Sequence, residues 1–84
     1  MNIDQVNNIM SKIRDWMYDE FGLKIDFDDR YIDSGAIDSF DMIVLVDFIE
    51  ENYNLKFSPG DFQDPRFFTI KGLSELVLEK TSDA

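Results

Sequence analysis

The residues of this chain best suited to chemistry gather around Ser39, where an acidic, irregular stretch gives way to an apolar run. The run predicts a helix from Ser39 to about Tyr53. A serine at such a junction can cap the helix by accepting a hydrogen bond from a first-turn N–H group. It can also present an exposed hydroxyl for a phosphate, because the free N–H groups and the helix dipole favour an anion there. The local sequence leaves both interpretations open.

The composition excludes most catalytic uses of that serine. The chain has no cysteine and no histidine, so it lacks a thiolate nucleophile, a disulfide, and the usual general base near neutral pH. A hydrolase with Ser39 as nucleophile would have no histidine to activate it. The acids Asp26, Asp28 and Asp29 invite comparison with a calcium-binding loop, but the required glycine and closing glutamate are not at their places. The sequence therefore predicts neither an enzyme nor a metal site.

Charge points to protein partners. Eighteen acids stand against eight bases, a net charge of -10, and nine acids but only Arg30 among the bases lie between Asp26 and Glu51. Such a surface repels nucleic acid and anionic membranes and attracts basic protein surfaces. No apolar run reaches the roughly 18 residues of a membrane span, and the N-terminus has no signal-peptide pattern. We expect a cytoplasmic, monomeric protein with no stable membrane association.

A first helix is predicted from about Ile3 to Phe21. Its apolar residues recur every three or four positions, as in an amphipathic helix, at Ile3, Val6, Met10, Ile13, Met17 and Phe21, with Ile9 and Trp16 widening the stripe. Gly22 is expected to end it. Residues 23–38 show no helical period, which predicts a long loop anchored by its apolar residues.

The second helix, from Ser39 to Tyr53, is apolar around much of its circumference. The residues predicted to face inward are Met42, Ile43, Leu45, Val46, Ile49 and Tyr53. The acids predicted to face outward are Asp41, Asp47, Glu50 and Glu51, and Phe40, Val44 and Phe48 add further apolar surface. Such a helix either is central to the core or uses a second face for a partner or ligand.

The last third of the chain predicts a short helix and a longer one. Residues 58–61 suit a cap and first turn, with Phe62 anchoring a very short helix that ends before Pro65. Thr69 is expected to cap the last helix, whose core-facing residues are Ile70, Leu73, Leu76, Val77 and Lys80. Residues 81–84 would form a frayed tail. The sequence thus predicts one all-α domain over residues 1–84, a small four-helix bundle of three main helices and one short helix.

Three stretches in this arrangement resemble the acyl carrier protein family, and the resemblance covers nearly the whole chain. They are residues 33–40, Asp-Ser-Gly-Ala-Ile-Asp-Ser-Phe; Glu50-Glu51 at the end of the second helix, with Tyr53 and Leu55 beyond; and Phe68-Thr69-Ile70 at the start of the last. The resemblance implies that Ser39 carries 4'-phosphopantetheine, transferred from coenzyme A, whose thiol holds an acyl or aminoacyl group as a thioester. A phosphopantetheinyl transferase would supply the base and metal, and Asp38 would help to engage it.

The resemblance also implies partners. The carrier would meet an acyl- or aminoacyl-loading ligase or transferase and the downstream synthase enzymes of fatty-acid or polyketide biosynthesis. The residues assigned to these contacts are Asp38, Phe40, Asp41, Val44, Asp47, Glu50 and Glu51.

Departures from the fatty-acid-synthase carriers indicate a specialised role. Two residues separate Gly35 from Asp38, where those carriers usually have one. Val44 occupies a position that is commonly acidic, and Asp47 one that is commonly apolar. This form is similar to discrete carriers of specialised pathways, including D-alanyl carrier proteins. An acidic protein-interaction module with an unmodified Ser39 is the other interpretation.

Overall fold

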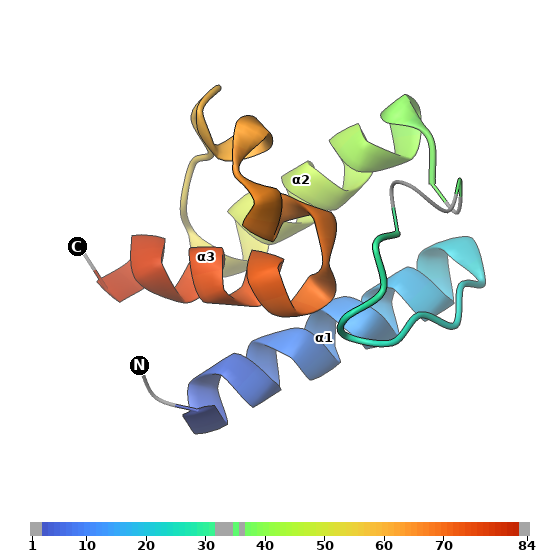
Figure 1. Cartoon of the computed structure of the whole chain (residues 1–84), viewed down its shortest axis with the longest axis horizontal. Helices are drawn as coiled ribbons and strands as arrows, with labels where there is room; N and C mark the ends of the chain where they lie inside the picture. The colour runs from blue at the N-terminus through green and yellow to red at the C-terminus, as the bar shows by residue number, and fades with distance from the viewer. Residues whose placement is uncertain (1–2, 32–34, 36, 83–84) are drawn as a thin grey trace.

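All regular structure in the part of the chain that the computed structural model describes, residues 3–31, 35 and 37–82, is helical (Figure 1). Three α-helices and two short 3-10 helices follow one another as α1 (Ile3–Phe21), α2 (Ser39–Tyr53), η1 (Asp61–Gln63), η2 (Pro65–Phe68) and α3 (Ile70–Ser82). The end of α1 and the start of α2 lie toward the same end of the molecule, at the right of Figure 1. The described residues between these two helices form turns and irregular backbone.

Helix α1 buries the stripe that its spacing predicts. Its buried side chains are Val6, Ile9, Met10, Ile13 and Met17. Trp16 and Phe21 are half-buried against the core. Ile3, predicted to begin the stripe, is instead 73% exposed, as the first turn of α1 extends past the buried part of the helix. Gly22 has a φ of 70° and donates its N–H to the Tyr18 carbonyl at 2.9 Å, so it ends the helix as predicted.

Helix α2 exposes one residue that was predicted to face inward. Leu45 and Ile49 are buried as expected, but Ile43, predicted to face inward, is 63% exposed. Four further residues are half-buried against the core: Met42, Val46, Phe48 and Tyr53. With apolar residues nearly all round the helix, spacing alone did not determine which side would be covered.

The segment after α2 forms two short helices where one was predicted. Phe62 lies in η1, and Pro65 begins η2 rather than simply following the end of a helix. Proline suits a first helical position because its missing N–H would have no partner there. The Asp64 side chain caps η2 by accepting the Arg66 N–H at 2.9 Å.

Helix α3 packs against α1 and η2. The Thr69 Oγ1 accepts the Gly72 N–H at 3.0 Å, which is the predicted N-cap interaction. All four apolar residues predicted for its core side, Ile70, Leu73, Leu76 and Val77, are buried. Lys80, also predicted for the core side, is only partly buried. Its side-chain ammonium pairs with the Asp61 carboxylate at 2.7 Å.

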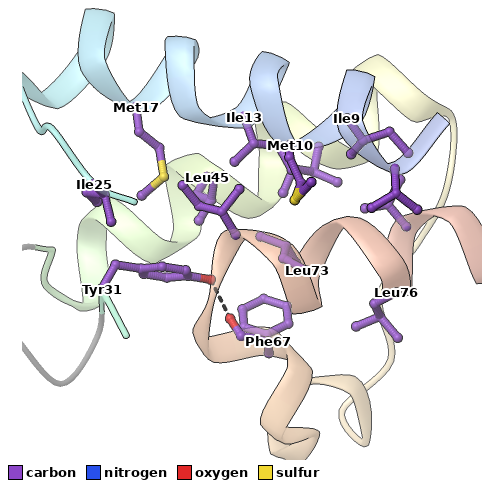
Figure 2. Packing of buried hydrophobic residues seen from close by; sticks show 14 of the residues in the cluster. Ile9, Met10, Ile13, Met17, Ile25, Tyr31, Leu45, Phe67, Leu73 and Leu76 are labelled. Atoms are coloured by element: carbon purple, nitrogen blue, oxygen red, sulfur yellow. Dashed lines mark hydrogen bonds between the residues drawn. The ribbon is translucent and has the colours of Figure 1, made fainter. Parts of the chain in front are cut away.

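The connection between α1 and α2 is tied to the rest of the fold at three buried residues, Ile25, Tyr31 and Ile37, as predicted for an anchored segment. Figure 2 shows the Tyr31 hydroxyl directed at Phe67, to whose carbonyl it donates a hydrogen bond. The Lys71 N–H also donates to the Phe27 carbonyl at 2.9 Å. Ile32, which was expected to contribute, lies outside the described residues.

Tyr31 should make the fold sensitive to alkali. Burial raises the pKa of its phenol well above the ordinary 10.0. The unfolded chain therefore ionises first, and the stability that Tyr31 contributes is fully present below pH 10 and lost as pH rises above it. We expect Tyr31→Phe to cost about 1–3 kcal/mol at neutral pH, since the Phe67 carbonyl loses its donor. It should also flatten the decline of the melting temperature above pH 10.

In Tyr31→Phe the melting temperature should still fall somewhat at alkaline pH, because partial burial also raises the pKa of Tyr53. Tyr18 is exposed, so Tyr18→Phe provides the matched control and should leave the thermal unfolding curve unchanged at neutral pH. If the melting temperatures of Tyr31→Phe and the wild type fell equally between pH 9 and 12, Tyr31 would not be the titrating group.

Candidate functional site

The N-terminus of α2 is closed by Asp38, not by Ser39. Asp38 has extended backbone, with φ -101° and ψ -174°, and its Oδ1 accepts the Asp41 N–H at 2.9 Å. In return, the Asp41 Oδ2 accepts the Asp38 N–H at 3.4 Å, which completes a capping box. The interpretation of Ser39 as the N-cap is therefore wrong.

Ser39 is the first residue of the helix, and its side chain is exposed. Its hydroxyl makes no hydrogen bond to any described residue. Helix geometry leaves the N–H groups of Ser39 and Phe40 without intrahelical partners. The exposed hydroxyl thus stands at a helix end with free donors, although the carboxylates of Asp38 and Asp41 oppose the favourable dipole. Both carboxylates accept backbone N–H groups, and neither forms a hydrogen bond with the Ser39 hydroxyl.

Ser58, unlike Ser39, has a hydroxyl that takes part in hydrogen bonds within the fold. Its N–H and its hydroxyl both donate to the Asp61 Oδ2, at 2.7 and 3.1 Å. Burial raises the pKa of Asp61, but hydrogen bonds from Lys80 and Ser58 outweigh it and hold that pKa below its usual value. Ser34, the other serine that follows an aspartate, lies outside the described residues.

Most of the residues assigned to partner binding lie on the exposed part of α2. Phe40 is 71% exposed; Asp38, Asp47 and Glu51 are exposed as well, whereas Asp41 and Val44 are half-buried. Ile43, which was predicted to face inward, is a further exposed residue of α2. Its position four residues after Ser39 is the available signal, because residues four apart share a helix face.

Glu50 is much less exposed than Asp47 and Glu51, the other acids near it on α2. Its side chain is only 17% exposed; its Oε2 accepts the Phe57 N–H at 2.9 Å, and its Oε1 lies 3.7 Å from the Lys56 Nζ. The chain can fold back over Glu50 because Asn54 adopts a left-handed conformation, with φ 53°, at the end of α2. A groove of about 590 Å³ lies here, lined by Asp47, Glu50, Glu51, Asn54, Leu55 and Lys56.

Ion pairs neutralise acids elsewhere in the described part of the chain, and in α2 Glu50 lies near Lys56, but Asp47 and Glu51 stay unpaired there. Arg66 bonds Asp64 at 3.0 Å and Glu79 at 2.7 Å, and hydrogen bonds from Arg66 lower the pKa of Asp64. Lys80 similarly pairs with Asp61. Asp47 and Glu51, by contrast, form no ion pair with a described residue. The surface of α2 that carries Asp47 and Glu51 therefore has a negative potential.

Within residues 3–31, 35 and 37–82, no group of three or more acids could hold a metal ion. Nor is any helix of that part long and apolar enough to cross a membrane. Comparison of the chain with family models, with curated proteins and with solved structures finds no match.

Proposed function

We propose that this chain is a small carrier protein, not itself an enzyme, in which Ser39 is the attachment point of 4'-phosphopantetheine. The observation that carries the proposal is the exposed Ser39 hydroxyl at the first position of α2, with the capping role taken by Asp38. The resemblance of residues 33–40 to acyl carrier proteins is the second support. The finer fold description, a four-helix carrier bundle with a long loop before α2 and η1–η2 as its short element, belongs to the same proposal.

The residues around Ser39 fit this group. A phosphodiester on the Ser39 Oγ would stand near the free N–H groups of Ser39 and Phe40, which can donate to it, while the carboxylates of Asp38 and Asp41 would repel it. When bound, the group supplies the thiol that a chain without cysteine lacks, and that thiol carries the cargo as a thioester. The Ser39 Oγ would bond the coenzyme A phosphorus that bears the pantetheine, and adenosine 3',5'-bisphosphate would leave. The hydroxyl proton would pass to a base of the transferase.

The exposed face of α2 would be the docking surface. Asp38, Asp41, Asp47 and Glu51 would steer a basic partner, and Phe40 and Val44 would supply the apolar contact that contributes more of the affinity. Glu50 has a smaller part in this proposal than the sequence assigned to it, because its carboxylate holds the chain after α2. The exposed Phe40 on an acidic helix also favours a second candidate, an interaction module that works without modification.

A direct experiment separates the two candidates. The protein is incubated with coenzyme A, magnesium and a promiscuous phosphopantetheinyl transferase, and its intact mass is measured. Gain of one phosphopantetheine supports the carrier proposal. No gain, under conditions that convert a standard carrier completely, would overturn it and leave the unmodified interaction module.

The residues at 44 and 47 should restrict which enzymes load the carrier. We expect a fatty-acid-synthase malonyl transferase to load the wild-type holo-protein at least about tenfold more slowly than a standard carrier, which corresponds to about 1.4 kcal/mol. The double variant Val44→Glu/Asp47→Met should recover part of that rate, because it restores the usual acid and the usual apolar contact. Malonylation is followed by mass spectrometry.

The single variant Asp47→Ala is the control for a nonspecific effect of removing charge. It removes the same acid as Asp47→Met but adds no large apolar side chain. Rapid malonylation of the wild type, with no gain in the double variant, would show that the specialised-pathway proposal is wrong.

A further inference from the structure

The break between η2 and α3 is bridged by a segment that is distant in sequence. The Lys71 N–H, near the start of α3, donates to the Phe27 carbonyl at 2.9 Å. The Phe67 carbonyl, near the end of η2, accepts a hydrogen bond from the buried Tyr31 hydroxyl. We call residues 27–31 the strap and residues 67–71 the joint. The strap thus pairs two backbone groups that lie at helix ends, where helix geometry supplies no partner.

The same two backbone groups would pair with each other in an uninterrupted helix. Lys71 follows Phe67 by four residues, so its N–H would donate to the Phe67 carbonyl, as in any α-helix. Thr69 lies between them and interrupts the helix, because its backbone is extended, with φ -131° and ψ 157°. Neither the broken nor the continuous form therefore leaves these two groups unpaired, provided that the strap is in place in the broken form.

The sequence of residues 65–82 suits one continuous helix. Pro65 fits a first helical position, and Asp64 already acts as the cap before it. Phe67 precedes the first residue of α3 by one turn, so a continuous helix would place it in line with the buried apolar stripe of α3, which contains Ile70, Leu73 and Val77. Local preference thus favours one helix where the tertiary structure has two.

Gly72 is needed only in the broken form. Helix α3 packs against η2, and a Cβ on residue 72 would overlap the backbone of Arg66. In a continuous helix these two residues, six apart, would be separated by about 9 Å along the axis, and a Cβ on residue 72 would point outward like any other. Alanine at residue 72 therefore opposes the joint and favours the long helix.

We propose that the joint is a conformational switch controlled by the strap. With the strap bound, η2 and α3 are two helices; with the strap released, residues 65–82 form one helix. The strap belongs to the connection that leads to Ser39, so its release would also loosen one anchor of that connection. A partner that binds the released strap more tightly than the bound one would shift the chain toward the long helix. The switch does not depend on modification of Ser39.

Two variants act on opposite sides of the joint and are measured in the unmodified protein. Tyr31→Phe keeps the ring but removes the donor to the Phe67 carbonyl, and Gly72→Ala introduces the backbone clash. We expect each variant to raise the ratio of the long to the broken form about tenfold, because an unpaired buried carbonyl and an overpacked contact each cost free energy of that order. The double variant should have the largest population of the long helix.

NMR spectroscopy distinguishes the two forms residue by residue. In the double variant, we expect the Thr69 Cα resonance to move into the helical range. A nuclear Overhauser contact should appear between the Phe67 Hα and the Lys71 N–H, and contacts between Phe27 and Lys71 should disappear. A residue that becomes helical in a less stable protein is not explained by loss of stability alone, so this readout is specific to the switch.

Ile9→Val provides the control. It removes one buried methylene from α1, outside the strap and the joint, and so lowers stability through the core. Thr69 should remain extended in this variant. A helical Thr69 in Ile9→Val would overturn the proposal, because stability and not the strap would then control the joint.

The other outcomes are equally decisive. If the contacts between Phe27 and Lys71 disappeared while Thr69 stayed extended, the break would be independent of the strap and the proposal would be wrong. Fraying of residues 65–71 into irregular chain would also overturn it. Should the double variant fail to fold, the two single variants are measured in the same way, and an unchanged Thr69 in both would contradict the switch.

Discussion

Ser39→Ala should abolish the addition of phosphopantetheine completely, since only a side-chain oxygen at residue 39 can form the phosphodiester. The fold should not change, because Asp38 and Asp41 cap α2 without any contribution from the Ser39 hydroxyl. We expect a difference in unfolding free energy within about 0.5 kcal/mol, as for ordinary surface substitutions. Intact mass after incubation with the transferase measures the first effect, and thermal unfolding measures the second.

Two other serines serve as controls. Ser34 follows Asp33 and so repeats the dipeptide of the proposed site, and Ser58 precedes a short helix. Neither Ser34→Ala nor Ser58→Ala should reduce the added mass, although Ser58→Ala should lower stability slightly because Asp61 loses a hydrogen bond. If modification persisted in Ser39→Ala and disappeared in Ser34→Ala, the attachment point would be Ser34.

Gly72→Ala should destabilise the fold although alanine is the better helix former. A Cβ on residue 72 would lie 2.3 Å from the Arg66 carbonyl oxygen and 2.6 Å from the Arg66 Cα. These are backbone atoms, so the clash cannot be relieved by rotation of a side chain, and η2 must move away from α3. We expect the free energy of unfolding to fall by about 1–3 kcal/mol because of overpacking. This is the net effect, with the roughly 1 kcal/mol gain in helix propensity already subtracted. Urea denaturation measures the change.

Gly60→Ala is the matched control. Residue 60 has φ -65°, and an added Cβ would meet no atom within 4 Å. That variant should be neutral or more stable by about 0.4–1 kcal/mol, because alanine restricts the unfolded chain. If Gly72→Ala proved as stable as Gly60→Ala, the close approach of η2 and α3 would not limit residue 72.

The sequence by itself determined the elements whose two faces differ clearly. In α1 and α3 the three- and four-residue spacing separates apolar from polar side chains, and the predicted stripes are buried apart from the exposed Ile3 and the half-buried Trp16, Phe21 and Lys80. Gly22 and Thr69 marked helix ends because each acts through a local geometry, a left-handed turn and a first-turn hydrogen bond. Ser39 was singled out in the same local way, by its place before an apolar run.

Tertiary structure decided what depends on neighbours distant in sequence or on competition between adjacent groups. Ile43 is exposed because α2 is apolar nearly all round, and only packing selects the covered side. Asp38 caps α2 in place of Ser39 because it stands before the first helical residue and pairs with Asp41. Glu50 holds the chain after α2, and Gly72 lies against η2, through contacts that no local spacing encodes. A periodic pattern specifies a helix and its apolar stripe, whereas the partner of each surface is specified only when the helices pack together.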